Sequence, residues 1–303
     1  MDLPASVTAL GEQLGGTGEI APEPALFQAT DVFAAERERI FLRPWVAVDH
    51  ATRLDRDGNY FRFDAATRSM LVTRDGGGRL HALRNVCIHA GYPVCDAQEG
   101  GAERLVCPYH GWEFTLEGRL VEPAFASRTD RSRLRLASYP IRVQNGLIFV
   151  DLSGGDTTSD ENIPGPLPPW LAKGRVTKRA QYGTTWNWKF VLQFFRSHPE
   201  LFFDDPRDAD EDERRIEFGP LDWMLVRPQQ AALIRVIPRF AERSDLQMIR
   251  VAAKEVRETE VSDNGADPVT EALRCTGEAT AANWASRLDR SFFSWYWPLM
   301  ARS

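Results

Sequence analysis

The sequence predicts an α+β fold in which a small all-β domain is followed by a helix-covered antiparallel sheet. Residues 45–152 consist of short alternating apolar runs separated by turn signals, which is typical of a β domain. The segment 162–170, NIPGPLPPW, is rich in proline and is the best candidate for a linker. Helical and strand-like spacing are mixed beyond it, which favours an α+β second half.

The first half begins with residues 25–45, whose apolar spacing is helical until Pro44 stops it. Seven runs then predict strands: WVAVDHA (45–51), YFRFDA (60–65), SMLVTRD (69–75), RLHALRNV (79–86), LVCPYH (105–110), EFTLEG (113–118) and GLIFVDL (146–152). Turns are expected at Asp57–Gly58, Asp75–Gly78, Glu117–Gly118 and Asn145–Gly146.

The second half predicts a helix near 184–203, one strand-like run at 224–240 and another at 246–256, and a closing helix over 280–297. The run DDPRDADEDERR at 204–215 is expected to be a solvated loop or the start of a helix. We therefore expect three parts: an N-terminal helical segment at 1–44 that packs on the second domain, a β domain at 45–155, and an α+β domain at 156–303.

Composition narrows the class of protein. The 303 residues carry 37 basic and 43 acidic side chains, a net charge of −6, which argues against a nucleic-acid binder. No segment approaches the ~18 apolar residues of a membrane span. No basic residue precedes Arg37, so no signal peptide is expected and the protein is predicted to be cytoplasmic. Its four cysteines are then better candidates for metal binding than for disulfides.

Two Cys–His pairs provide the strongest chemical signal. Cys87-Ile-His89 is followed, after 17 residues, by Cys107-Pro-Tyr-His110. A [2Fe–2S] cluster with two cysteines on one iron and two histidines on the other needs this ligand set. A structural Cys₂His₂ zinc site is the alternative, but zinc fingers pair cysteine with cysteine and histidine with histidine. The mixed pairs favour the cluster.

These motifs resemble those of a known family. NVCIHAG (85–91) and CPYHGWEF (107–114) are similar to the two cluster loops of the large (alpha) subunits of Rieske-type aromatic-ring-hydroxylating oxygenases, although Ala90 replaces the usual arginine. The resemblance implies that 45–155 is a Rieske [2Fe–2S] domain. It also implies that Cys87 and Cys107 hold the inner iron, and that His89 and His110 hold the outer, solvent-facing iron. By the same resemblance, 156–303 is an oxygenase-like domain, shortened and with a degenerate iron site.

In this family the second domain binds a mononuclear Fe(II) through two histidines and a carboxylate, after an Asn-Trp-Lys signature. The signature is present at 187–189, but the register then places Gln193, Glu200 and Asp205 where the family has Glu, His and His. His198 is the only histidine after His110. The resemblance therefore implies that this chain lacks the mononuclear iron.

A salvaged metal site, meaning one formed by other side chains of the second domain, remains an alternative. Its candidate residues are His198, Glu200, Asp205 and Asp289. The structural alternative is a capping box at Ser197-x-x-Glu200, with Pro199 in the first turn of a short helix.

The implied function is that of a Rieske subunit in a ring-hydroxylating or demethylating oxygenase system. Electrons would come from an NAD(P)H-linked flavin or ferredoxin reductase. They would reach a mononuclear iron in a related catalytic oxygenase subunit, within a trimeric or hexameric ring. Two alternatives stay open: an active oxygenase with an unusual ligand set around His198, and a stand-alone Rieske electron-transfer protein. No nucleic-acid or membrane partner is expected.

Overall fold

The computed structural model describes residues 2–42, 45–122, 134–153, 166–203, 213–254, 256, 267–275 and 288–302. The chain divides into two units. The β unit comprises Pro44–Ile163 and Leu167–Ala172, and the sheet–helix unit comprises Met1–Arg43, Pro164–Pro166 and Lys173–Ser303. Residues 167–172 lie in the β unit, beyond the boundary expected near 155. One reason is that the Leu171 carbonyl accepts a hydrogen bond of 2.9 Å from Nε2 of the buried His50.

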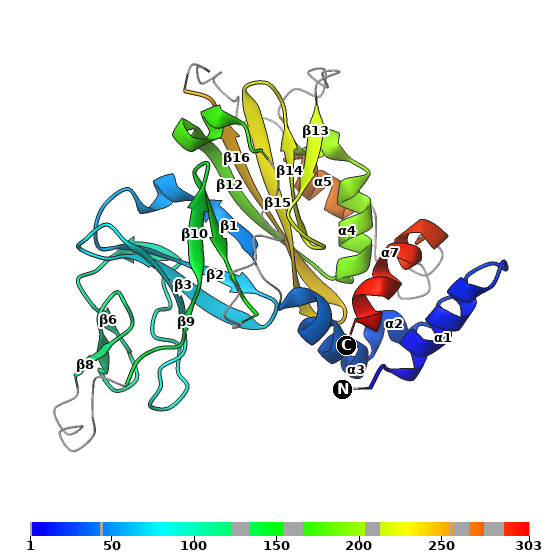
Figure 1. Ribbon diagram of the computed structural model, residues 1–303, viewed down its shortest axis with the longest axis horizontal. Coiled ribbons are helices and arrows are strands. Elements are labelled where there is room, and N and C mark those ends of the chain that lie inside the picture. Colours follow the sequence, from blue (N-terminus) through cyan, green and yellow to red (C-terminus); the bar gives the residue numbers. More distant parts are fainter. Residues whose placement is uncertain are drawn as a thin grey trace. The chain divides into compact units, whose positions relative to one another are not determined.

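Three antiparallel sheets make up the described part of the β unit (Figure 1). The first has the order β1-β11-β10, with bounds Val46–His50, Leu147–Val150 and Ile141–Gln144. The second has the order β5-β2-β3-β4-β9, with bounds Glu99–Gly101, Asn59–Ala65, Arg68–Arg74, Leu80–Arg84 and Ser138–Tyr139. The third has the order β6-β7-β8, with bounds Leu105–Val106, Glu113–Phe114 and Leu120–Glu122. Short 3-10 helices cover Ala51–Leu54 and Pro169–Lys173.

The four predicted turns of this unit are confirmed. Asn145 and Gly146 both adopt positive φ, 46° and 81°, as a two-residue hairpin turn requires. Two strand predictions were too long, since 105–110 and 113–118 contain only β6 and β7. The first run ends early because Pro108 has no N–H, and because the Gly111 amide turns back to the Cys107 carbonyl at 2.9 Å.

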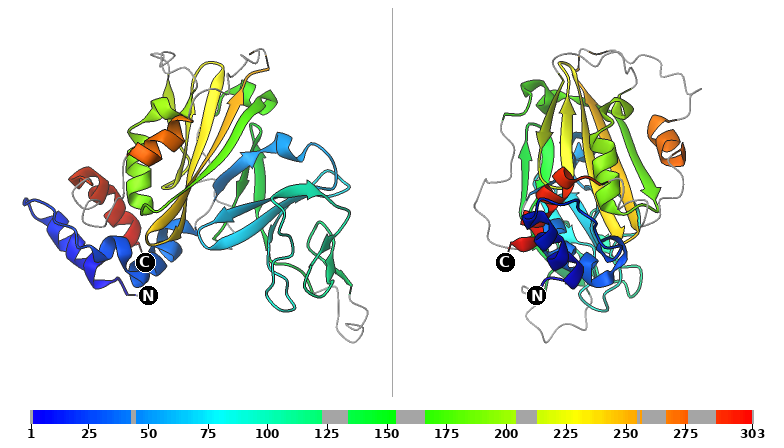
Figure 2. Two further views of the ribbon diagram at one scale, coloured as in Figure 1. Left: turned by 180° about the vertical axis from the view of Figure 1, so that it is seen from behind. Right: turned by 90° about the vertical axis from the view of Figure 1, so that its right-hand side faces the viewer.

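The sheet–helix unit is built on one antiparallel sheet of order β12-β16-β15-β14-β13 (Figures 1 and 2). Its strands span Arg175–Thr184, Arg243–Ala252, Gln230–Phe240, Asp222–Val226 and Arg214–Glu217. Its helices are α1 (Ala5–Gly15), α2 (Ala25–Gln28), α3 (Thr30–Glu36), α4 (Trp188–Arg196), α5 (Pro268–Cys275) and α7 (Arg290–Ala301). A π-helical turn follows α3 at Arg37–Phe41, and a 3-10 helix covers Pro199–Phe202. Helix α4 packs on β15 and β16, while α7 packs on α1 and the π-helical turn.

Several predicted elements are corrected here. The helix expected over 25–45 is interrupted at Ala29, whose ψ of 134° is extended. The helix expected near 184–203 starts only at Trp188, because Asn187 caps it, and ends at Arg196. The run 224–240 contains a hairpin between β14 and β15, closed by the Arg227 amide and the Gln230 carbonyl at 2.8 Å.

Other predictions fall partly outside the described residues. Of the charged run, 204–212 is not described, and its last two residues, Arg214 and Arg215, begin β13 rather than a helix. Of the closing helix, the described part starts at Arg290.

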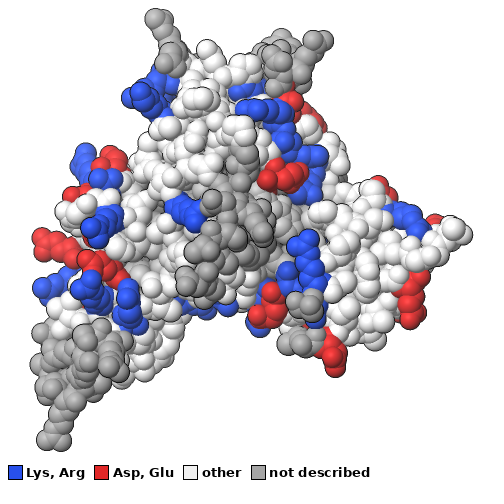
Figure 3. Space-filling model, viewed as in Figure 1, with Lys and Arg blue, Asp and Glu red and all other residues white. Residues whose placement is uncertain are grey.

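On the face drawn in Figure 3, basic and acidic side chains lie side by side. In the described part of the chain, no helix has the length and apolar character needed to cross a membrane.

Candidate metal centre

The first Cys–His pair lies on a tight loop between β4 and β5. The Cys87 amide donates to the Tyr92 carbonyl at 2.7 Å, and the Gly91 amide donates to the Cys87 carbonyl at 2.9 Å. Gly91 has a φ of 73°, in the left-handed region that favours glycine. The closed loop presents His89 at its exposed tip and keeps Cys87 at its base.

The second pair lies on a loop of the same construction between β6 and β7. The Cys107 amide donates to the Trp112 carbonyl at 2.9 Å, and the Gly111 amide donates to the Cys107 carbonyl at 2.9 Å. Gly111 has a φ of 68°. The sequence spacing differs between the loops, Cys-x-His against Cys-x-x-His, but the backbone closure is the same.

The structure brings the four side chains together as two pairs. Cys87 and Cys107 are each 2% exposed, whereas His89 and His110 are exposed, with ring centroids 4.6 Å apart. Burial raises the pKa of the Cys87 thiol. The backbone N–H groups of His89 and Ala90 act in the opposite direction, and a hydrogen bond with the Cys107 thiol raises the pKa further.

The chemistry of this donor set fits a [2Fe–2S] cluster. Cys87 and Cys107 are free thiols, so both sulfurs are available to a metal. Two neighbouring thiols lie beneath two neighbouring imidazoles, which matches a cluster with cysteine on one iron and histidine on the other. The amides of His89 and Ala90, which point at the Cys87 sulfur, are the kind of donors that tune such a cluster.

Both loops rest on a shared apolar core. Cys87 and Cys107 belong to a buried cluster with Val94, Leu105, Phe114 and other residues. Asn85 ties the first loop to the segment after it, because its side chain donates to the Cys95 carbonyl at 2.8 Å and accepts from the Cys95 amide at 2.9 Å. Sequence reasoning missed this role of Asn85, since an asparagine beside a strand end is an ordinary turn signal.

Two other histidines of the β unit have structural partners. His50 is buried and bonds to Thr52 Oγ1 through Nδ1 at 2.9 Å. Nε2 of His81 lies 2.7 Å from a carboxylate oxygen of Asp75.

In the sheet–helix unit, the Asn-Trp-Lys segment begins α4. The Asn187 side chain accepts from the Lys189 amide at 2.9 Å and so caps the helix. Its Nδ2 donates to the carbonyls of Phe27, at 3.0 Å, and Ala241, at 2.5 Å. One side chain therefore joins α4 to α2 and to the β15–β16 hairpin.

The next two residues of the segment converge on a buried carboxylate. Glu36 forms an ion pair with Lys189 and accepts from Trp188 Nε1 at 2.8 Å and from the Tyr296 hydroxyl at 2.8 Å. Lys189 also donates to the Leu26 carbonyl at 2.7 Å. Burial lowers the pKa of Lys189, and the Glu36 carboxylate opposes that change. In this structure, the signature residues thus anchor α4 to α2, α3 and α7.

Three of the four candidates for a salvaged metal site lie in the described residues. His198 directs Nδ1 to the Phe194 carbonyl at 2.7 Å and stacks on the Phe194 ring, with centroids 4.3 Å apart. Glu200 is exposed, and Asp205 lies outside the described residues. Asp289 caps α7 by accepting from the Phe292 amide at 2.9 Å. Within the described ranges, no three His, Cys, Asp or Glu side chains could surround a single ion.

The predicted capping box at Ser197 is wrong. The Ser197 hydroxyl donates back to the Gln193 carbonyl at 3.0 Å, because Ser197 is the C-terminal cap of α4. The residue that precedes the 3-10 helix is His198, and its side chain makes no capping hydrogen bond. Pro199 does stand in the first turn, as expected.

A cavity of about 370 Å³ borders the last turns of α4. It is lined by Leu192, Gln193, Arg196, Ser197, Arg215, Asp289, Ser291, Phe292 and Trp295. The Arg196 guanidinium pairs with Glu217 at 2.6 Å and lies over the rings of Trp223 and Trp295. Asp289 and Gln193 therefore line the same cavity. A charged group that lines it with them is the cationic guanidinium of Arg196.

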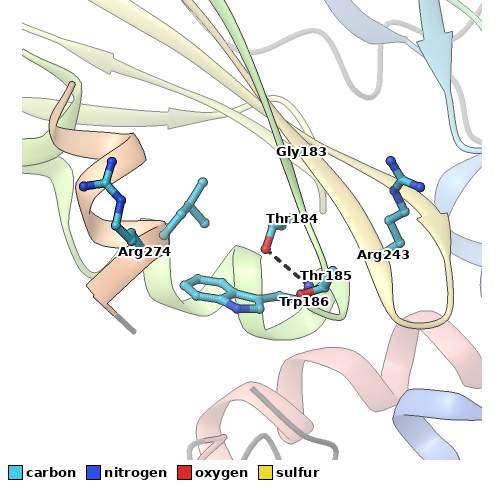
Figure 4. Close-up of a pocket in the computed structure, with 7 residues that line it drawn as sticks. Gly183, Thr184, Thr185, Trp186, Arg243 and Arg274 are labelled. Carbon is cyan, nitrogen blue, oxygen red and sulfur yellow. Dashed lines mark hydrogen bonds between the residues drawn. The ribbon is translucent and has the colours of Figure 1, made fainter. Parts of the chain in front are cut away.

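A second cavity, of about 690 Å³, is lined by Gly183, Thr184, Thr185, Trp186, Arg243, Leu273 and Arg274. Figure 4 shows Arg274, on α5, and Arg243, at the start of β16, on opposite sides of Thr184 and Trp186. Sequence reasoning singled out none of these residues. None of its lining residues belongs to the Cys–His loops or to the last turns of α4.

Several known proteins are similar to this chain. The model of the Rieske [2Fe-2S] domain matches residues 44–140. The glycine betaine monooxygenase oxygenase subunit of Chromohalobacter salexigens is 30% identical over 249 residues, covering 74% of this chain and 54% of that protein. The corresponding subunit of Pseudomonas aeruginosa is 28% identical over 183 residues, covering 56% and 43%. The chain thus spans about half the length of these curated relatives.

Solved structures share the fold. The quaternary ammonium Rieske monooxygenase CntA, in complex with gamma-butyrobetaine, superposes with a TM-score of 0.70 at 19% identity, covering 98% of this chain and 90% of that one. Naphthalene 1,2-dioxygenase from Rhodococcus sp. gives 0.60 at 18% identity, covering 95% and 85%. The expected fold class, an all-β Rieske domain followed by a helix-covered sheet, is confirmed. The chain has a Rieske [2Fe–2S] domain and is a homologue of the alpha subunits of Rieske oxygenases, which are oxidoreductases.

Proposed function

We propose that this chain is the iron–sulfur subunit of a Rieske oxygenase system, and that it carries electrons from a reductase toward a mononuclear iron. Cys87 and Cys107 bind one iron of the cluster, and His89 and His110 bind the other. The observation that carries the proposal is the pairing of two buried thiols beneath two exposed imidazoles, on loops with the same closure. When bound, the cluster supplies one-electron transfer.

The surrounding residues support that role. The buried thiols keep one side of the site away from water, and the amides of His89 and Ala90 point at the Cys87 sulfur. The exposed imidazoles place the other side at the surface, where a redox partner can approach. We assign the electron source to an NAD(P)H-linked flavin or ferredoxin reductase, and the reaction class to ring hydroxylation or oxidative demethylation.

We further propose that the mononuclear iron lies in a related catalytic subunit of a trimeric or hexameric ring. Three features support this location. Gln193, Glu200 and Asp205 stand at the positions that the resemblance assigns to metal-site residues. The Nδ1 atom of His198 is engaged by the Phe194 carbonyl. The cavity at the end of α4 holds the cationic Arg196.

Iron and sulfide analysis of the purified holoprotein, with EPR of its reduced form, tests both proposals. We expect two irons and two sulfides per chain and a Rieske-type signal. Cys107→Ser should remove all of the iron, whereas His198→Ala should leave the count unchanged.

A third iron that disappears in His198→Ala would place the mononuclear site in this chain. That result would overturn the partner location without affecting the cluster assignment. The absence of sulfide and of the EPR signal from wild-type protein would overturn the cluster assignment itself.

A further inference from the structure

Five aromatic rings form a continuous series across the two Cys–His loops. In order they are Tyr92, Tyr109, His110, His89 and Trp112. Successive centroids are separated by 5.3, 3.7, 4.6 and 4.8 Å. Tyr92 and His89 belong to the first loop, and the other three rings belong to the second. The series therefore passes from one loop to the other three times.

Its outer end is formed by Tyr92 and Tyr109, which are tilted by 34°. Offset or tilted rings at this separation attract each other beyond the area that they bury. The two side chains are 44% and 58% exposed, so burial in the core does not account for where they lie. The Tyr92 ring contacts the Tyr109 ring, and the Tyr109 ring also contacts the imidazole of His110.

The other end is formed by Trp112, whose ring is nearly parallel to that of His89, at 9°. Trp112 is also the residue whose carbonyl closes the second loop. Similarly, the carbonyl that closes the first loop belongs to Tyr92. Each loop is thus closed by a residue whose ring reaches the other loop.

No covalent link joins the loops, since Cys87, Cys95 and Cys107 are free thiols. Apart from the bonds of a bound cluster, noncovalent contacts must therefore hold the two Cys–His pairs at their distance. Loop backbones are the more mobile parts of a domain, and a metal site needs its ligands held in place by their neighbours.

We propose that the Tyr92–Tyr109 pair is an aromatic clasp that positions the two ligand loops and slows loss of the cluster. This inference rests on the proposed function, because it takes Cys87, His89, Cys107 and His110 as the ligands. The tyrosines are positioning residues, and they act through His110 and through the closure of the first loop.

The test measures cluster loss from the full-length holoprotein under excess iron chelator, followed by visible absorption. Tyr92→Ala and Tyr109→Ala should each speed loss by between about twofold and tenfold, the range that one aromatic pair represents. Tyr92→Phe and Tyr109→Phe keep the rings and should behave as wild type. Ile88→Ala removes another exposed apolar side chain of the first loop, which lies outside the ring series, and is the matched control.

The double variant Tyr92→Ala/Tyr109→Ala shows whether the two rings act as one contact. If they do, it loses the cluster no faster than the worse single variant. The EPR signal of the reduced cluster should broaden in the alanine variants and remain sharp in the phenylalanine variants.

Additive effects, loss rates equal to those of Ile88→Ala, or phenylalanine variants as impaired as alanine variants would each overturn the clasp. A wild-type protein without a cluster would instead overturn the proposed function.

Discussion

The Lys189 ammonium group pairs with the Glu36 carboxylate in the interior of the sheet–helix unit, where the two side chains are 0% and 1% exposed. A buried pair of this kind is stable only when further hydrogen bonds satisfy both ions. Trp188 and Tyr296 supply them to the carboxylate, and the Leu26 carbonyl accepts from the ammonium. In the family that this chain resembles, the Asn-Trp-Lys signature precedes a metal site. In this chain the same residues connect helices to one another.

Lys189→Met should destabilise the protein strongly, because it leaves the Glu36 charge buried without its cation. We expect the free energy of unfolding, measured in urea, to fall by about 3–5 kcal/mol. Adding Glu36→Leu should recover part of that loss, since both charges are then gone. Arg37→Ala breaks an exposed pair with Glu38 and should cost less than about 1 kcal/mol. Equal losses in Lys189→Met and Arg37→Ala would contradict the importance of the buried pair.

Cys107→Ser and Cys95→Ser should distinguish a cysteine that binds the cluster from one that does not. The first removes a proposed thiolate ligand, and the purified protein should lack visible absorption and acid-labile sulfide. The second leaves the bonds to Asn85 intact, since these involve only the backbone of Cys95, and should keep a full cluster. Loss of the cluster in Cys95→Ser would show that the ligand assignment is incomplete.

Asp289 should behave as a helix cap rather than as a metal ligand. Asp289→Ala is expected to lower the free energy of unfolding by about 1 kcal/mol at neutral pH, whereas Asp289→Asn, which can still cap, should change it little. Iron content should be unchanged in both variants. A loss of iron in Asp289→Asn would reopen the alternative of a metal site.

Acid should remove the contribution of the Asp289 cap to the stability of the fold. Hydrogen bonds from the Ser291 hydroxyl and the Phe292 amide lower the pKa of its carboxyl. The folded protein therefore binds this proton less readily than the unfolded chain. The cap contributes fully above the ordinary value of about 3.9, and its contribution is lost as pH falls through the lowered pKa. The difference in Tm between wild type and Asp289→Ala should shrink in that range.

Gly146→Ala should disturb the β unit at the turn between β10 and β11. Gly146 has a φ of 81°, and a Cβ there would collide with Nε2 of His50 and approach the Ala172 Cα at 3.1 Å. The hydrogen bond from His50 to the Leu171 carbonyl would be displaced. We expect the free energy of unfolding, measured by thermal unfolding, to fall by more than about 1 kcal/mol. Gly76→Ala, which has open space around the new methyl group, should leave Tm nearly unchanged.

The cluster loops could be predicted from sequence because their information is local. Cysteine, histidine, glycine and the turn residues lie within a few positions of one another, and hydrogen bonds within each loop fix its backbone. The sheet–helix unit was harder to predict from the sequence. Strand β12, RVTKRAQYGT, was not predicted, because it is an edge strand that alternates between half-buried and exposed residues and carries three cations.

Helix α1 was missed for a different reason. It has no side-chain cap, no acid in its first turn and an internal Gly11. That glycine is explained by tertiary contact, since a Cβ there would come within 2.5 Å of the Trp297 ring. The role of Glu36 was equally hidden, because an acid in a charged helical run looks like a surface residue until its distant partners are known.

Helix α4 has its most deeply buried polar contacts at its beginning. Asn187, Trp188 and Lys189 bind it to three other segments, whereas the side chains of Ser197 and His198 return to carbonyls of its own last turns. The ion pair at its last turn, between Arg196 and Glu217, is partly exposed. Because the buried contacts of residues 187–189 already join α4 to its neighbours, exchange of side chains near its end can change the chemistry there while the position of the helix is kept.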